Sequence, residues 1–408
     1  MKIEAQGTYL TCDGEPFFWL ADTAWNAVLK ATDEEFEQYL IARKAQGFNV
    51  IQFVCTHWRA YVEEQAFTLD PLVIDEGFFA RRDRRVAMIR EHGLIPAPVL
   101  LWALMENDPG VYLSEEDAIA LARYIVDRWG GDPVVWFLGG DGHYYGDKAE
   151  RWHRIGRGVF GDGERGDLVT MHPCGQSWVT AEFRHEPWFG FHGYQSGHGD
   201  SEDELRWLLN GPPERPGEGD PVQPIINLEP NYEGHKSYAT KLPFDAHAVR
   251  RAAYWSLLVS PTAGVTYGNN SIWWWGRKPE DPLAHEWLGP VAPWQEGLDL
   301  PGIRSMTVLK NFFEALPWWE LRPAQDLLAA QPGQDDPKRY VTVAATEDRS
   351  TLVAYLPVGG AIALQSPPAG LQARWFDPRE GTYRKADASG PGFTAPDEQD
   401  WVLLLQTH

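Results

Sequence analysis

Two patterns of hydrophobic residues alternate along most of this chain. Short apolar runs, which predict buried strands, occur at residues 17–22, 48–55, 94–101, 134–138, 168–171, 189–194, 224–229 and 263–267. Between them, apolar residues recur every three to four positions, as Ile119, Ala122, Ile125 and Val126 do, which is the spacing of an amphipathic helix. Eight strands that alternate with helices predict an α/β fold of the (β/α)8 TIM-barrel type.

Local signals support the helices of this prediction. Residues 32–35 and 201–204 each place Thr or Ser three positions before Glu, the pattern of a capping box that opens a helix. A doubly wound open sheet would also alternate strands and helices. That fold commonly carries a glycine-rich phosphate loop after its first strand, and no such loop follows residue 22. The barrel is therefore favoured.

The pattern changes after Pro323. Short β runs at 339–345, 351–357, 361–365, 371–376, 382–385 and 401–405 are separated by polar turns, which predicts a small antiparallel β-sandwich. We therefore expect two domains. Residues 1–322 form the barrel, with a short β entry at residues 7–17, and residues 323–408 form the sandwich.

Composition narrows the classes of partner. The 408 residues carry a formal net charge of -22, which argues against nucleic acid or an anionic membrane surface as a partner. The three cysteines are far apart, so neither a zinc cluster nor a disulfide framework is indicated. No apolar run reaches membrane-spanning length, and residues 1–7 lack the apolar core of a signal peptide, so we expect a cytoplasmic protein. The sequence does not indicate an oligomeric state.

Polar and aromatic side chains follow the carboxyl ends of the predicted strands. In a parallel barrel these ends meet at one mouth, where the chemistry of such folds takes place. The opposite ends of the strands are poorer in such groups. We therefore expect a substrate site that includes Asp22, Trp25, His57, Trp58, Trp102, Asp141, His143, His172, Gln195, His198, Glu229, Tyr232 and Tyr267.

Two carboxylates in this ring could perform glycoside hydrolysis. Asp141 follows the fourth strand and Glu229 ends the seventh, so they would face each other across the mouth of the barrel. One would protonate the leaving oxygen, while the other attacks the anomeric carbon or activates water. Residues 139, 140 and 142 are glycines, which we expect to let substrate approach the backbone. The alternative for Asp141 is an Asx turn beside these glycines.

The chain contains 20 tryptophans, which is unusually many. Most should fill the core, but residues 273–275 are three adjacent tryptophans that one strand or helix face cannot bury together. We expect one of them, Trp274, to stack on a sugar ring in the cleft.

The histidines in the ring leave a metal-dependent site as an alternative, since a catalytic zinc needs three protein ligands. The first strand reads Leu20-Ala21-Asp22, where metal-dependent barrels commonly carry His-x-His. We therefore expect His172 and His198 to bond to sugar hydroxyls or to orient the carboxylates, and we expect no metal or cofactor.

Several long motifs resemble the apiosidase-like glycoside hydrolases. They are residues 18–25 (FWLADTAW), 44–52 (KAQGFNVIQ), 136–141 (WFLGGD), 195–199 (QSGHG), 229–234 (EPNYEG), 250–255 (RRAAYW) and 266–268 (TYG), in the family's order. Residues 375–379 and 400–404 resemble the β-sandwich of the collagen-binding type that follows the barrel in this family. The chain departs from the family at Asn231, where a cysteine is common, and in the Trp-rich loops after the second and eighth strands.

The resemblance implies that Asp141 is the acid/base and Glu229 the nucleophile of a retaining glycosidase. We predict that this glycosidase is exo-acting. Its substrate would be a small glycoside that carries terminal apiose or another pentofuranose. Trp25, Trp58 and Trp102 would shape the pocket, His172, Gln195, His198 and Tyr267 would hold hydroxyl groups, and Tyr232 would orient Glu229. A carbohydrate-binding protein without catalysis and a metal-dependent hydrolase that uses the histidines are the alternatives.

Overall fold

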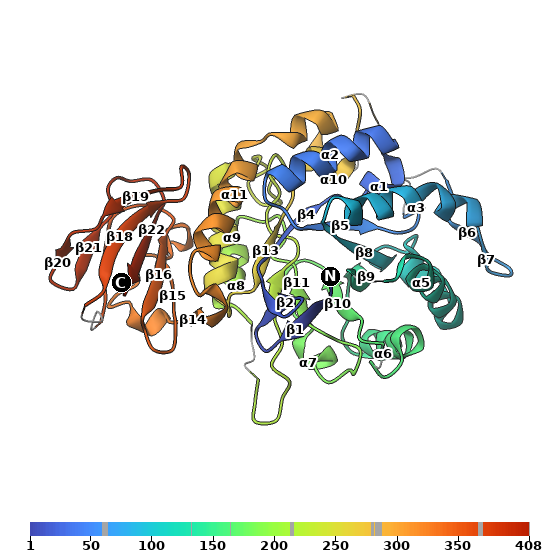
Figure 1. The fold of residues 1–408 in the computed structure, drawn as a ribbon, viewed down its shortest axis with the longest axis horizontal. Helices are drawn as coiled ribbons and strands as arrows, with labels where there is room; N and C mark the ends of the chain where they lie inside the picture. The colour runs from blue at the N-terminus through green and yellow to red at the C-terminus, as the bar shows by residue number, and fades with distance from the viewer. Residues whose placement is uncertain are drawn as a thin grey trace.

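The computed structural model describes residues 1–58, 64–131, 133–163, 165–212, 216–278, 281, 288–365 and 370–407. Figure 1 shows a barrel of strands and helices beside a smaller all-β part at the C-terminal end of the chain. The predicted fold class, a (β/α)8 barrel followed by an antiparallel β domain, is confirmed. In the part of the chain that is described, no helix is long and apolar enough to cross a membrane.

The barrel sheet contains eight parallel strands in the order β10-β9-β8-β5-β4-β13-β12-β11. Seven of these strands begin within two residues of the predicted start, and β11 begins three residues after it. Strand β9 continues beyond its predicted end at residue 138 and includes Asp141. The strands are β4 (Trp19–Thr23), β5 (Val50–Val54), β8 (Ile95–Trp102), β9 (Val135–Gly142), β10 (Leu168–Pro173), β11 (His192–Tyr194), β12 (Ile225–Asn227) and β13 (Gly264–Tyr267).

The barrel closes between β10 and β11 through a side chain rather than a regular ladder. The hydroxyl of Thr170 donates to the carbonyl oxygen of Phe191 at 2.6 Å and accepts from the backbone N–H of Gly193 at 3.0 Å. The backbone N–H of Gly190 also donates to Val169 at 2.8 Å. These bonds bring the last two edges together and place all eight carboxyl ends at one mouth.

Seven helices longer than eight residues surround this sheet within the described ranges. Both predicted capping boxes are present, at the starts of α2 and α8. The last barrel helix begins at Pro301, which is compatible with the first turn of a helix. The helices are α2 (Asp33–Ala45), α3 (Glu76–Glu91), α5 (Glu115–Trp129), α6 (Asp147–Phe160), α8 (Glu202–Asn210), α9 (Ala246–Leu258) and α11 (Pro301–Glu314).

Shorter elements were too brief for hydrophobic periodicity to reveal. The N-terminal β entry is a three-stranded antiparallel sheet of β1 (Ile3–Gln6), β2 (Tyr9–Cys12) and β3 (Glu15–Phe17). The others are β6 (Phe67–Thr68), β7 (Val73–Ile74), α1 (Ala27–Lys30), α4 (Pro109–Tyr112), α7 (Thr180–Phe183), α10 (Asn270–Trp274), η2 (Trp294–Leu298), η3 (Trp318–Glu320), η4 (Gln325–Leu327) and η5 (Pro337–Arg339).

The C-terminal part consists of two antiparallel sheets. The larger has the order β14-β15-β16-β22-β18-β19 and the smaller β17-β21-β20. A core of its own includes Leu352, Trp375, Trp401 and Leu403. The strands are β14 (Arg322–Pro323), β15 (Thr342–Ala345), β16 (Thr351–Leu356), β17 (Ala361–Ala363), β18 (Gln372–Asp377), β19 (Thr382–Lys385), β20 (Ala388–Ser389), β21 (Gly392–Thr394) and β22 (Trp401–Gln406).

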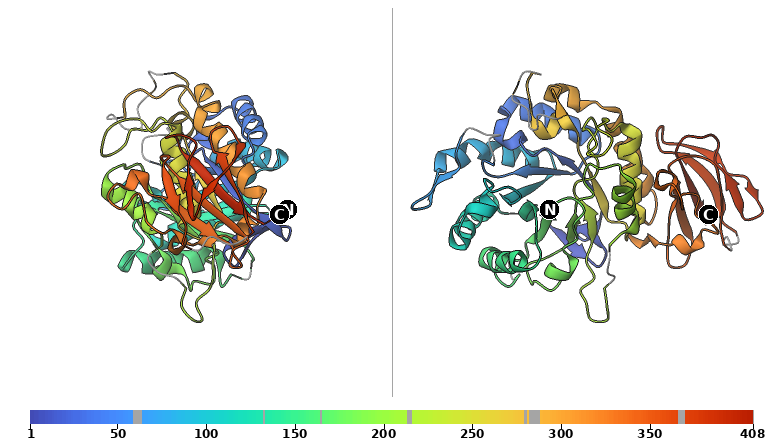
Figure 2. Two further views of the ribbon diagram at one scale, coloured as in Figure 1. Left: turned by 90° about the vertical axis from the view of Figure 1, so that its left-hand side faces the viewer. Right: turned by 180° about the vertical axis from the view of Figure 1, so that it is seen from behind.

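The two parts share a second hydrophobic core. Helices α9 and α11 lie between the barrel strands and the larger C-terminal sheet, as seen in Figure 1 and in the right-hand view of Figure 2. Tyr254 of α9 stacks on Tyr355 of β16 with ring centroids 4.5 Å apart, and Phe312 of α11 lies 4.5 Å from Phe376 of β18. The C-terminal sheet is therefore packed on the helices that flank β12 and β13.

Candidate active site

A cavity opens at the carboxyl ends of the barrel strands. Its walls hold both predicted catalytic carboxylates and five of the predicted substrate-binding residues. The cavity is lined by Trp25, Trp58, Trp102, Asp141, His198, Glu229, Tyr232, His235, Tyr238 and Trp273. Because ligand sites are commonly lined by aromatic side chains with a few converging polar groups, this cavity is the candidate active site.

Glu229 lies two residues beyond β12 and is only 7% exposed. Nε2 of His198 is 3.0 Å from its Oε1, and Nε2 of His172 is 3.2 Å from its Oε2. Burial acts to raise the pKa of this carboxyl, but the contacts with the two histidines outweigh it and lower the pKa well below the ordinary value. Glu229 is therefore held as a carboxylate at neutral pH.

If the activity needs ionised Glu229, the contact with His198 should determine the pH below which kcat/KM falls. Replacing His198 with alanine removes a stabilising contact, so the pKa of Glu229 should rise, and the acidic limb of kcat/KM should move to higher pH by about one to two units. The measurement is kcat/KM against pH with a neutral glycoside.

A matched control for this experiment is His153→Ala on α6. His153 contacts the carbonyl oxygen of Glu182 and does not line the cavity. Its removal should leave the acidic limb in place. An unchanged limb in His198→Ala would show that His198 does not control the ionisation of Glu229.

Asp141 reaches the cavity because the backbone of β9 is irregular there. Gly140 pairs with His172 and Gly142 pairs with Pro173, so Asp141 is an extra residue that bulges from the ladder. Its φ of 44° is in the left-handed region, which Asp tolerates better than most residues. Bulges of this kind redirect side chains next to active sites. Nε2 of Gln195 donates to Oδ1 of Asp141 at 3.4 Å and helps to hold it.

Packing accounts for the glycines around Asp141, and close approach of a substrate to the backbone there stays a prediction. A Cβ atom on Gly140 would lie 2.5 Å from Val99 and 2.7 Å from the ring of Trp102. A Cβ atom on Gly142 would lie 2.6 Å from the ring of Tyr144. Glycine is needed here because the large rings occupy the space that a side chain would take.

Aromatic rings form a rigid wall of the cavity. Trp102 contacts both Trp25 and Trp58, with centroids 5.3 and 4.5 Å apart. The indole N–H of Trp25 donates to the hydroxyl of Tyr232 at 3.1 Å, and that of Trp58 donates to the side chain of Asn26 at 3.0 Å. These polar bonds fix the rings, whose faces can pack on an apolar face of a ligand.

Four other residues predicted for the site lie away from the cavity walls. Strand-end position alone did not reveal that their side chains meet partners elsewhere. Asp22 pairs with Arg43 of α2 at 2.6 Å, and the hydroxyl of Tyr267 donates to Glu233 at 2.7 Å. Nδ1 of His57 accepts from the backbone of Ala66, and the ring of Trp274 lies under the ammonium group of Lys30 at 3.5 Å.

Three more predicted residues stand directly behind the wall. His172 is fully buried beneath Glu229, and Gln195 bonds to Asp141. His143 contacts Cys174 at 3.0 Å and the hydroxyl of Tyr145 at 2.7 Å. Direct contact of these residues with a substrate stays a prediction.

Three residues of the wall were missed by the sequence analysis. His235 and Tyr238 belong to the loop after β12, and the rings of His235 and His198 are 4.3 Å apart. Tyr238 is 48% exposed at the rim. Trp273 lines the cavity in place of its neighbour Trp274. The sequence could have indicated His235 and Tyr238, because their loop follows the carboxyl end of a predicted strand.

Among the residues that the structure describes, no group of three or more His, Cys, Asp or Glu side chains is arranged to hold a metal ion. Two of the histidines considered for such a site, His172 and His198, instead converge on Glu229. The polar groups present are suited to proton transfer and to nucleophilic attack by a carboxylate.

Comparison with known proteins gives consistent matches. The model of the apiosidase-like catalytic domain matches residues 4–320, and that described as "putative collagen-binding domain of a collagenase" matches residues 323–406. A solved structure named "Glycoside hydrolase" is 25% identical with a TM-score of 0.83, over 100% of this chain and 97% of that one. None of the curated proteins matches this chain.

Two other solved structures show the fold. One is described as a glycoside hydrolase family 5 from Bacteroides vulgatus ATCC 8482, which is 23% identical over 100% of this chain and 93% of that one, with a TM-score of 0.83. The other is the endo-1,4-beta-mannanase from Rhizomucor miehei, which is 11% identical over 65% of this chain and 90% of that one, with a TM-score of 0.52.

Proposed function

Because this chain belongs to the apiosidase-like family of glycoside hydrolases, we propose that it removes a terminal sugar from a small glycoside with retention of configuration. The family makes the chain a glycosidase. The sugar we propose is apiose or another pentofuranose, and the cleavage is exo-acting. The observation that carries the proposal is that Asp141 of β9 and Glu229, just beyond β12, line one cavity.

The proposed first step forms a covalent intermediate. A carboxylate oxygen of Glu229 attacks the anomeric carbon, while the bond from that carbon to the leaving oxygen breaks. Asp141 transfers its proton to the leaving oxygen. The ionised state of Glu229, which His172 and His198 favour, supports its role as the nucleophile.

The second step releases the sugar. Asp141, now a carboxylate, takes a proton from a water molecule as the water oxygen attacks the anomeric carbon. The bond to Glu229 breaks and the carboxylate is restored. Two successive displacements retain the configuration, and they require carboxyl groups roughly 5 to 5.5 Å apart.

The shape of the cavity supports a single terminal ring as the bound group. Four tryptophans, Trp25, Trp58, Trp102 and Trp273, line it and leave little open space between them. Tyr238 also lines the cavity and is half-exposed, so we propose that it contacts the aglycone. A long polysaccharide crossing the mouth would fit such an enclosure poorly.

The experiment is hydrolysis of a panel of aryl and alkyl glycosides, with furanosides and apiosides included, by wild type and Asp141→Ala. We expect Asp141→Ala to lose about 10²- to 10⁴-fold in kcat/KM with alkyl leaving groups, because they need protonation. Nitrophenyl glycosides, whose leaving group is already acidic, should lose far less. The first-formed anomer, read by NMR, should have the configuration of the substrate.

Three results would contradict parts of this proposal. An inverted first product would exclude retention, and an equal loss with all leaving groups would remove Asp141 from the role of acid. Activity that disappears after exhaustive chelation and returns with metal would instead support the metal-dependent alternative.

A further inference from the structure

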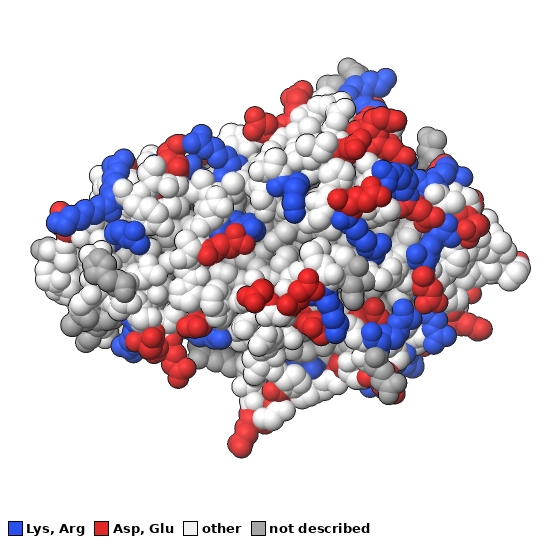
Figure 3. Space-filling view, viewed as in Figure 1, with Lys and Arg blue, Asp and Glu red and all other residues white. Residues whose placement is uncertain are grey.

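The C-terminal part of the chain carries a cationic groove at its free edge. The groove lies along β18 and β19 and is lined by Gln372, Ala373, Arg374, Tyr383, Arg384, Lys385 and Ala386. Three cations and no acids line it, although residues 323–408 hold seven Lys and Arg against eleven Asp and Glu. In Figure 3 blue atoms gather at the left end of the molecule, over these strands. The positive charge is therefore segregated on an acidic protein.

The register of the two strands brings two of the three cations together on one face, whereas Arg384 projects to the other face, over the ring of Trp401. Arg374 and Lys385 are directly opposite each other in the antiparallel pair, so their side chains project to the same side. Tyr383, two residues before Lys385, shares that side. The guanidinium of Arg374 lies 4.6 Å from the centroid of its ring, which fixes both groups.

The groove is open to a large ligand. Every residue of β19 is exposed, Tyr383 to 42%, and β19 is the last strand of its sheet. One acid, Asp387, lies 2.5 Å from Lys385, but both side chains are more than three-quarters exposed, so water and salt weaken that pair. The exposed ring of Tyr383 beside two cations therefore offers an aromatic surface to a ligand.

We propose that this groove binds a glycan chain that carries carboxylates, that is, a polyuronate. Arg374 and Lys385 would bond to the carboxylates, and the open part of the Tyr383 ring would pack on a sugar face. A glycan rather than a nucleic acid is favoured as the anionic occupant, because the chain belongs to a family of glycoside hydrolases. The residues that line this groove and those that line the active-site cavity are different, so the groove would hold the protein on the glycan rather than take part in cleavage.

The test is affinity electrophoresis of the full chain through gels that contain polygalacturonate or alginate, with a neutral galactan and polyglutamate as comparison polymers. We expect the two polyuronates alone to retard the wild type. Added salt should weaken the retardation because exposed charges are screened. The double variant Arg374→Ala/Lys385→Ala should bind about tenfold more weakly or worse, since two charge-assisted contacts are lost.

A matched control removes equal charge elsewhere. Arg81→Ala/Arg84→Ala deletes two exposed cations of α3 on the barrel and should keep wild-type retardation. Both double variants should hydrolyse a small aryl glycoside at the wild-type rate, which separates this proposal from that for the active site. No retardation by either polyuronate, equal retardation by polyglutamate, or equal losses in both double variants would overturn the proposal.

Discussion

Replacing Glu229 with glutamine should lower kcat/KM by about 10⁴-fold or more, the scale of loss when a hydrolase loses its nucleophile. Glutamine keeps the size of the side chain and can still accept a hydrogen bond from His198. It cannot attack the anomeric carbon as a carboxylate does. The measurement is the hydrolysis of the best aryl glycoside of the panel. Because attack precedes release of any aglycone, the loss should be large with every leaving group, unlike that in Asp141→Ala.

The chain offers a matched control four residues further on. Glu233 is in the same loop and is also buried, but its carboxylate accepts from the hydroxyl of Tyr267 and from the backbone N–H of Gly302. Glu233→Gln should therefore keep most of the activity. Full activity in Glu229→Gln, or a larger loss in Glu233→Gln, would show that the nucleophile was assigned to the wrong carboxylate.

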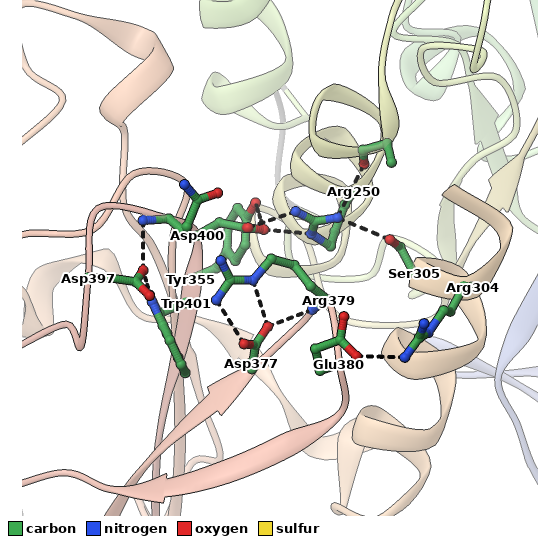
Figure 4. Close-up of polar contacts among 12 residues, drawn as sticks. Arg250, Arg304, Ser305, Tyr355, Asp377, Arg379, Glu380, Asp397, Asp400 and Trp401 are labelled. Carbon is green, nitrogen blue, oxygen red and sulfur yellow. Dashed lines mark hydrogen bonds and ion pairs between the residues drawn. The ribbon is translucent and has the colours of Figure 1, made fainter. Parts of the chain in front are cut away.

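Replacing Asp400 with alanine should destabilise the whole protein by about 3 to 5 kcal/mol, the cost of leaving one charge of a buried pair without its partner. Arg250 of α9 and Asp400 are 5% and 2% exposed, and two hydrogen bonds of 2.6 and 2.7 Å join them (Figure 4). Tyr355 also donates to Asp400, and Arg250 to Ser305. Chemical denaturation of the full chain measures the effect.

A second ion pair between the same two parts provides the control. Arg304 of α11 contacts Glu380 (Figure 4), but both side chains are more than half exposed. Arg304→Ala should cost at most about 1 kcal/mol, because exposed pairs are screened by water. Equal effects of the two substitutions would show that burial does not determine the strength of these contacts.

Removal of the C-terminal domain tests the same interface on a larger scale. A chain cut after residue 322 would expose Tyr254 and Phe312 and leave Arg250 unpaired. We expect it to aggregate or to lose activity. A soluble and fully active barrel would show that the sandwich is not needed for packing.

Much of the fold could be predicted because its signals are local. Each strand of the barrel is a short apolar run, and each major helix has its own periodicity or cap, so their order alone indicates the architecture. The two carboxylates could be found for the same reason. Asp141 and Glu229 stand at the carboxyl ends of strands, and the topology of a parallel barrel brings those ends to one mouth.

The direction of each side chain could not be read in this way. Asp22 and Asp141 are both acids at strand ends, yet Asp22 points to Arg43 of α2, whereas a bulge in β9 directs Asp141 into the cavity. Trp273 lines the cavity and Trp274 does not, although they are adjacent. A shift of one residue in register, or one irregular φ, decides the direction of such a side chain. Neither changes the hydrophobic periodicity of the sequence.

The sequence by itself therefore determined the architecture of this protein, its two domains in outline and the pair of acids at the mouth of the barrel. The tertiary structure alone decided what surrounds those acids. It placed His172 and His198 against Glu229, His235 and Tyr238 in the wall, and Arg250 beside Asp400, which is 150 residues away in the chain. The physical reason is the distance along the sequence over which residues interact. Strands and helices arise from neighbours along the chain, whereas burial, ionisation and pairing depend on segments that meet only when the chain folds.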